Sequence, residues 1–139
     1  MRLSGVKQAI IEAIEAITPD DSAGPRDTFT HIDTGGRDLE RAPDRVFRVA
    51  LSMVPRRGDL ITLDAYVGAF DLSVFYTPTP SIEDRIAKDA EKIVDALLPL
   101  HQQNTSIYRI DIEPGTVAEL DQFIAARFDL TVIYRLTGV

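Results

Sequence analysis

The sequence predicts an α+β domain: a mainly antiparallel sheet of four strands, or slightly more, with two helices packed on one face. Three observations lead to this prediction. Two segments carry apolar residues at three- and four-residue steps, several others alternate apolar with polar residues, and one strand-like heptapeptide occurs twice. A helix with a single apolar stripe packs that stripe on a sheet and exposes its opposite face to solvent, which gives two layers around one core. The whole chain, 1–139, is expected to form this one domain.

A repeated peptide predicts the order of the elements. Residues 70–76 read FDLSVFY and residues 128–134 read FDLTVIY, with five identical positions at an offset of 128 − 70 = 58. The same offset carries the strand-like run 49–54 onto a second one at 107–112. Shared offsets at two separate places predict one supersecondary unit used twice, in the order α-β-β-α-β-β with an internal pseudo-repeat. The alternative is chance likeness, because strands in general favour β-branched and aromatic residues.

The first element is a helix over residues 3–17, ended by Pro19. Its core-facing side holds six apolar residues at helical spacing: Leu3, Val6, Ile10, Ala13, Ile14 and Ile17. A long polar loop with several glycines and prolines follows at about 20–45, and loops of such length are typical of functional arms or of disordered segments. Residues 29–32 could form a short strand inside this loop.

Two or three strand-like runs come next. In the first, every second side chain is apolar and is expected to be half-buried: Phe47, Val49, Leu51 and Met53. Residues 60–66 have strand character without clean alternation. Residues 70–76 alternate strictly, until the prolines of 77–80 end the strand.

The strongest helix signal lies at 82–100. Thr79 or Ser81 can cap this helix, and two acidic residues in its first turn complement the helix dipole. A strand through Ile112 then ends at a Pro-Gly turn dipeptide, residues 114 and 115. Residues 117–126 are expected to form a short helix or an irregular return, and residues 128–136 the last strand. The apolar stripe of the helix consists of Ile82, Ile86, Ala90, Ile93, Leu97 and Leu100.

Composition argues against several classes of function. Without cysteine, the chain has no disulfide, thiolate zinc site or cysteine nucleophile. No run approaches the roughly 18 apolar residues that cross a bilayer, and Glu12 and Glu15 interrupt the apolar start, so neither a membrane span nor a signal peptide is expected. Synthesis is therefore expected inside the cell. With a net charge of −7 and only three lysines, sequence-specific binding of nucleic acid is not expected. An acidic wall would, however, let DNA slide past.

Candidate catalytic and metal-binding residues are few. His31 with Asp33 is a weak metal-binding fragment, and His101 suits the C-terminal end of a helix. Asp71 and Asp129 hold equal positions in the two repeats, where paired carboxylates could act as acid and base or bind a divalent cation. Both face water by the alternation rule, so we expect them to be solvated. No catalytic, cofactor-binding or metal-binding residue is therefore predicted.

The chain resembles the tail terminator family of long-tailed bacteriophages, proteins that complete the tail at the head–tail neck. The likeness lies in the element order, the long loop after the first helix, and the strands 70–76 and 128–134. The Pro-containing break and the amphipathic helix after residue 76 are also similar. The resemblance spans roughly residues 3–136 and is one of pattern, because the family has no invariant catalytic signature.

This resemblance implies a structural virion protein, made in the host cytoplasm, and no enzymatic activity. The family forms rings, commonly of six copies, that end polymerisation of the tail tube and offer a docking surface to the head connector. The implied partners are copies of the chain, the tube protein and the connector or neck proteins, with DNA only passing through the lumen and no cofactor. The loop at about 20–45 is implied to reach a neighbour or the tube. Two alternatives stay open: another neck component, and a small α+β enzyme or ligand-binding dimer.

Overall fold

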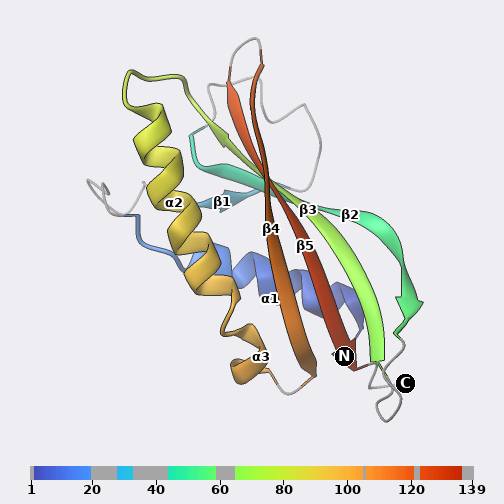
Figure 1. Cartoon of the computed structure of the whole chain (residues 1–139). Helices are drawn as coiled ribbons and strands as arrows, with labels where there is room; N and C mark the ends of the chain where they lie inside the picture. Colours follow the sequence, from blue (N-terminus) through green and yellow to red (C-terminus); the bar gives the residue numbers. More distant parts are fainter. Residues whose placement is uncertain are drawn as a thin grey trace.

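A computed structural model of the chain describes residues 2–19, 28–32, 44–58, 65–104, 106–120 and 123–135. Most of the predicted polar loop, Asp33, the strand-like residues 60–64 and Leu136 lie outside these ranges. The strands form one curled sheet in the order β1-β2-β3-β5-β4 (Figure 1). In chain order the elements are α1 (Leu3–Glu15), β1 (Thr30–His31), β2 (Val46–Arg57), β3 (Ala65–Tyr76), α2 (Ile82–Leu97), α3 (Leu100–Gln103), β4 (Ile107–Glu119) and β5 (Ile124–Arg135).

The predicted α+β class is confirmed. The finer prediction, a mainly antiparallel sheet of four strands or slightly more in the order α-β-β-α-β-β, is not confirmed. The described sheet has five strands and is mixed, because β1 runs parallel to the start of β2. Two backbone hydrogen bonds hold β1 in place. The N–H of Thr30 donates to the carbonyl of Arg45 at 3.0 Å, and the N–H of Ile32 donates to the carbonyl of Phe47 at 2.9 Å. The short helix α3 is a second element that the predicted order lacks.

The apolar stripes of α1 and α2 meet the sheet in a single core. Figure 1 shows α1 crossing behind the strands and α2 running beside them. The alternation predicted for residues 70–76 and 128–134 gives the correct inner face. Fully buried side chains of this core include Val6, Ile10 and Ile14 of α1, Ile93 and Leu97 of α2, Leu72 and Val74 of β3, and Leu130 and Val132 of β5.

The two copies of the repeated heptapeptide become the central strands, and they pair antiparallel. Asp71 lies directly opposite Asp129, and Leu72 lies opposite Phe128. When two copies of one peptide pair in opposite directions, only one residue meets its own equivalent, and here that residue is the aspartate. The hairpins β2–β3 and β4–β5 are therefore related by an approximate twofold axis that passes between Asp71 and Asp129. In this relation Ala50 of β2 corresponds to Glu113 of β4, an offset of 113 − 50 = 63. The predicted match of 49–54 with 107–112 at offset 58 is therefore wrong.

The second half of β2 departs from the predicted alternation. Leu51 and Met53, expected to point inward, are 52% and 46% exposed. Register irregularities fall between Leu51 and Met53 and again between Met53 and Arg56. Such bulges bend a strand, and Figure 1 shows β2 curving away from the helices. The prediction of a half-buried strand therefore holds as far as Val49 and is wrong beyond it.

Residues 117–126, predicted as a helix or an irregular return, belong to a β-hairpin on both sides of its turn. The register of β4 shifts between Pro114 and Val117, so the proline lies in a bulge on an edge strand, where its missing N–H is tolerated. Gly115 is needed because a Cβ at this position would lie 2.6 Å from the carbonyl oxygen of Arg127. The Pro-Gly pair therefore bends β4 without ending it.

We expect Val74→Asp and Val132→Asp each to unfold the domain, because a carboxylate in this core loses its hydration and gains no partner. Ser73→Asp is the matched control. Ser73 lies on the outer face, directly opposite Arg48 on one side and Arg127 on the other. Thermal melting followed by circular dichroism compares the three variants. A native-like transition for either valine variant would contradict this assignment of the inner face.

Candidate functional site

The outer face of the sheet brings together the two aspartates that the repeat singled out. Asp71 of β3 and Asp129 of β5 lie directly opposite each other, and Glu113 of β4 lies opposite Asp129 on its other side. All three residues are exposed, since strand neighbours alternate between the two faces of a sheet. Three carboxylates thus form a row across three adjacent strands. Both aspartates are exposed, as predicted, and the pairing that the repeat left open as an alternative is what the register brings about.

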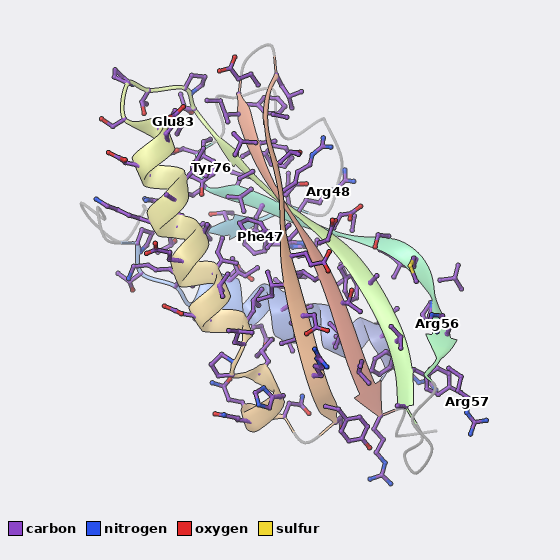
Figure 2. All side chains as sticks on the ribbon, in the orientation of Figure 1. Phe47, Arg48, Arg56, Arg57, Tyr76 and Glu83 are labelled. Carbon is purple, nitrogen blue, oxygen red and sulfur yellow. The ribbon has the colours of Figure 1, made fainter. Side chains whose placement is uncertain are left out.

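Two arginines stand beside this carboxylate row. Arg48 of β2 and Arg127 of β5 both lie opposite Ser73, two residues along β3 from Asp71. A hollow of about 470 Å³ lies among these side chains and is lined by both arginines and both aspartates. Figure 2 shows Phe47 and Arg48 on opposite sides of β2, which places the hollow on the face away from the helices.

The pKa of Asp71 is raised above the ordinary value of a carboxyl group. Desolvation of its carboxyl in the hollow is the first cause, followed by the hydrogen bond and the like charge of Asp129. The positive charges of Arg127 and Arg48 lower this pKa and offset part of the effect. Since two close carboxylates resist ionising together, Asp71 holds its proton more readily than an isolated aspartate would.

This arrangement suits contact with a charged molecule. The carboxylates can accept hydrogen bonds from basic groups, and the arginines can bind acidic ones. A metal site finds no support in the described ranges, where no group of three or more His, Cys, Asp or Glu side chains has the geometry to hold an ion. The row is therefore best described as a charged surface open to solvent.

Neither histidine joins the carboxylate row. His31 lies in β1, half-buried, with its ring centre 5.3 Å from that of Phe47. His101 lies in α3, exposed, with Nδ1 2.7 Å from the carbonyl oxygen of Leu98. Asp33, the predicted companion of His31, is outside the described residues.

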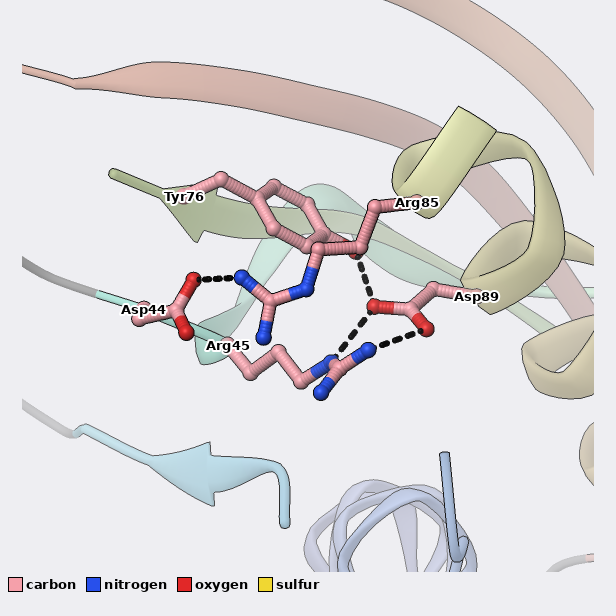
Figure 3. A network of polar contacts seen from close by, with 5 residues as sticks. All are labelled: Asp44, Arg45, Tyr76, Arg85 and Asp89. Carbon is pink, nitrogen blue, oxygen red and sulfur yellow. Dashed lines mark hydrogen bonds and ion pairs between the residues drawn. The ribbon is translucent and has the colours of Figure 1, made fainter. Parts of the chain in front are cut away.

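Sequence analysis missed a buried polar network between the sheet and α2. Arg45 donates from Nε and Nη2 to the two carboxylate oxygens of Asp89, at 2.8 and 3.1 Å (Figure 3). The hydroxyl of Tyr76 donates to the same carboxylate at 2.9 Å. The Arg45 guanidinium also lies 5.9 Å from the centre of the Phe29 ring. Since Arg45 and Asp89 are each only 1% exposed, this pair is part of the core.

A signal for this network exists in the sequence. Asp89 falls three residues after Ile86 and four before Ile93, so it interrupts the apolar stripe of α2. Acidic residues are seldom fully buried without a partner. The identity of the partner could not be predicted, because Arg45 is 44 residues away in a segment with no clear pattern.

Tyr76 remains a hydrogen-bond donor in this network. Burial raises the pKa of its hydroxyl far above the usual range, and the negative charge and hydrogen bond of Asp89 add to this effect. Arg45 and Arg85 lower the pKa and offset only part of the rise. The proton therefore stays on Tyr76, where it satisfies one of the buried Asp89 oxygens.

No protein-family model matches this chain, and no curated protein is similar to it in sequence. Among the described residues, no helix is both long enough and apolar enough to cross a membrane. Function must therefore be inferred from the surfaces of the fold and from the resemblance in sequence pattern.

We expect Asp71→Asn to stabilise the protein at neutral pH. A carboxyl whose pKa is raised by folding contributes stability below its ordinary value of 3.8 and loses it as the pH rises through the folded-state pKa. The amide does not ionise and so avoids this loss. We expect a gain of about 0.2–1 kcal/mol at pH 7, nearer the lower figure because solvent screens the exposed pair.

Urea unfolding measures this difference in the free energy of unfolding at pH 7 and again at about pH 3, where the gain should vanish. Asp111→Asn is the matched control, because Asp111 accepts a hydrogen bond from Arg109 at 2.8 Å. An equal gain for both variants at pH 7 would show that general charge reduction is the cause and not the pairing of Asp71 with Asp129.

We expect Asp89→Leu to lower the free energy of unfolding by about 3–5 kcal/mol, because it leaves the Arg45 charge buried without its carboxylate. Adding Arg45→Met should recover much of this loss, since an apolar pair needs no compensation of charge. Urea unfolding of both single variants and the double variant measures the interaction between the two residues.

The control for this cycle is Asp44→Asn. Asp44 forms a partly exposed ion pair with Arg85, and its loss should cost less than about 1 kcal/mol. Losses from Asp89→Leu and Arg45→Met that simply add would contradict a shared buried network.

Proposed function

We propose that this chain is a structural protein of a bacteriophage virion, the tail terminator. In this proposal copies of the chain close into a ring, commonly of six, that ends polymerisation of the tail tube and receives the head connector. Its partners are further copies of itself, the tube protein and the connector or neck proteins. DNA passes through the lumen without sequence-specific contact, and no cofactor takes part.

The observation that carries this proposal is the apolar surface on the bent half of β2. Leu51 and Met53 are about half exposed, and Val54 is 81% exposed. Clustered apolar side chains on an edge strand invite aggregation unless a specific partner covers them. Full burial of each such side chain contributes about 1.5–3 kcal/mol. A protein that functions by assembly supplies such a partner.

The charge of the chain also supports this role. The net charge is −7, and Asp71, Asp129 and Glu113 line up on the open face of the sheet. A wall of this sign repels phosphate groups. DNA can therefore move past such a ring without adhering to it.

One observation favours a different class of function. The hollow of about 470 Å³ between Asp71, Asp129, Arg48 and Arg127 is large enough for a small molecule. Its mixed charges would suit a ligand that carries both positive and negative groups. A ligand-binding protein or small enzyme would depend on these side chains, whereas a ring component would depend on its apolar edge.

Electron microscopy of phage particles assembled without this chain tests the proposal. We expect overlong tails, because the growing tube then lacks its stop. Tails of normal length lying beside DNA-filled heads would assign the chain to the neck instead. Intact, infectious particles would overturn any assembly role.

Variants supplied in trans separate the two classes of function. Leu51→Lys combined with Val54→Lys should fail to restore normal tails, because charged side chains resist burial in a contact. Asp71→Asn combined with Asp129→Asn should restore them. Circular dichroism is the control that checks whether both variants are folded. The opposite pattern would favour the hollow over the apolar edge.

A further inference from the structure

The sheet ends in two edges along which no described strand continues it. β1 pairs only with Val46 and Phe47, so from Arg48 onward the outer edge of β2 has no neighbouring strand in the described part of the chain. At the opposite end of the sheet, β4 pairs with β5 alone among the described strands. Such an edge presents backbone N–H and C=O groups that can extend the sheet by another strand.

A proline closes the open stretch on each edge. Pro55 follows residues 48–54 in β2, and Pro114 follows residues 107–113 in β4. Proline has no N–H to donate to a ladder. The two stretches before the prolines have the same length, seven residues each.

The strand directions allow these stretches to pair between two copies. Each of β2, β3, β5 and β4 is antiparallel to the next, so β2 and β4 run in opposite directions. When β2 of one copy lies beside β4 of another in the same orientation, the two strands are antiparallel. The contact therefore continues the antiparallel pattern where both strands keep a regular register, along residues 48–51 of β2 and 110–113 of β4.

Aligned end to end, the two stretches match in charge on the outer face. Arg48 of one copy lies opposite Glu113 of the next, and both side chains occupy the outer face in their own copy. Ala50 lies opposite Asp111 in the same register. Opposite charges that face each other across strands stabilise the pairing by about 0.2–1 kcal/mol.

The inner face matches as well. The same register sets Val49 opposite Ile112 and Leu51 opposite Ile110. Within one copy these residues lie in the core-facing rows, beside Leu72 and others of the central strands. Leu51, which is half exposed in the single chain, would gain an apolar neighbour from the next copy. The core-facing surfaces of two copies would then be continuous.

We propose that β2 of one copy pairs antiparallel with β4 of the next, with Arg48 opposite Glu113, and that this contact joins the ring. The inference rests on the proposed ring for its closure. Two different edges meet, so the contact is head-to-tail and can repeat around a closed assembly. Pairing of β2 with itself is disfavoured because this strand carries Arg48, Arg56 and Arg57 and no acidic residue.

A single engineered disulfide tests the contact, because the chain has no cysteine of its own. A tagged Ala50→Cys chain is mixed with an untagged Asp111→Cys chain, both full-length, under mild oxidation. Opposed residues of antiparallel strands are about 4.5–5.5 Å apart between Cα atoms, within reach of a disulfide. We expect the mixed dimer as the main product and little dimer from either variant alone. Glu83→Cys, at an exposed position on α2, replaces either partner as the control and should give only background.

Charge reversal provides a second measurement. Glu113→Arg sets two arginines against each other, and we expect it to weaken self-association about tenfold or more, as for like charges across an interface. Glu119→Arg makes the same change of charge on the same strand, beyond Pro114, and should leave association unchanged. Analytical ultracentrifugation measures both. Equal weakening would mean that net charge matters and this contact does not.

The outcomes separate this inference from the proposed function. Absence of the mixed disulfide, or disulfides that form mainly between like positions, would overturn the β2–β4 contact and leave a terminator ring built through other surfaces. A mixed disulfide together with tails of normal length in particles that lack the chain would uphold the contact and overturn the terminator role.

Discussion

The buried ion pair between Arg45 and Asp89 ties the start of β2 to α2, because neither charge can stay in the core without the other. A charge inside a core is tolerated only when its partner is in place, so β2 must begin where α2 presents its carboxylate. Tyr76, at the end of β3, donates to the same carboxylate, and Phe29, beside β1, lies near the guanidinium. Arg45 has a φ of 55°, in the left-handed region that few residues other than glycine adopt. The ion pair holds this conformation and thereby fixes three strands and a helix relative to one another.

The helices cover one face of the sheet, so its other face and its edges are available for contacts with other molecules. The register in which the two near-identical peptides pair sets Asp71 against Asp129. This like-charge contact lowers stability, and Arg48 and Arg127 offset it only in part. This loss of stability arises on the outer face, which contributes little to the core. The unfavourable Asp71–Asp129 contact is therefore exposed and accessible to a binding partner.

The sequence was sufficient for features that repeat with a regular period. The stripe of α1, the stripe of α2 and the inner faces of β3 and β5 all follow from spacing, because burial on one side dictates it. Features that depend on distant partners could not be predicted. Bulges after Leu51 bent the end of β2, and a bulge at Pro114 and Gly115 kept β4 extended. A short strand at 29–32 was a possibility in the sequence, but its parallel pairing depended on bonds to Arg45 and Phe47. The register that joins Asp71 to Asp129 was also hidden, since the repeat predicts equivalence and not direction.

The approximate twofold axis between the hairpins means that the two edges of the sheet offer similar patterns of backbone donors and acceptors. Backbone geometry alone would let an edge meet a second copy of itself. What distinguishes them is the arginine content of β2 against the acidic content of β4. Salt shortens the range of such forces, from a Debye length of about 10 Å at 0.1 M to about 3 Å at 1 M. In the proposed ring, selection of the correct neighbouring edge would therefore depend on ionic strength, and high salt would weaken it although each domain stayed folded.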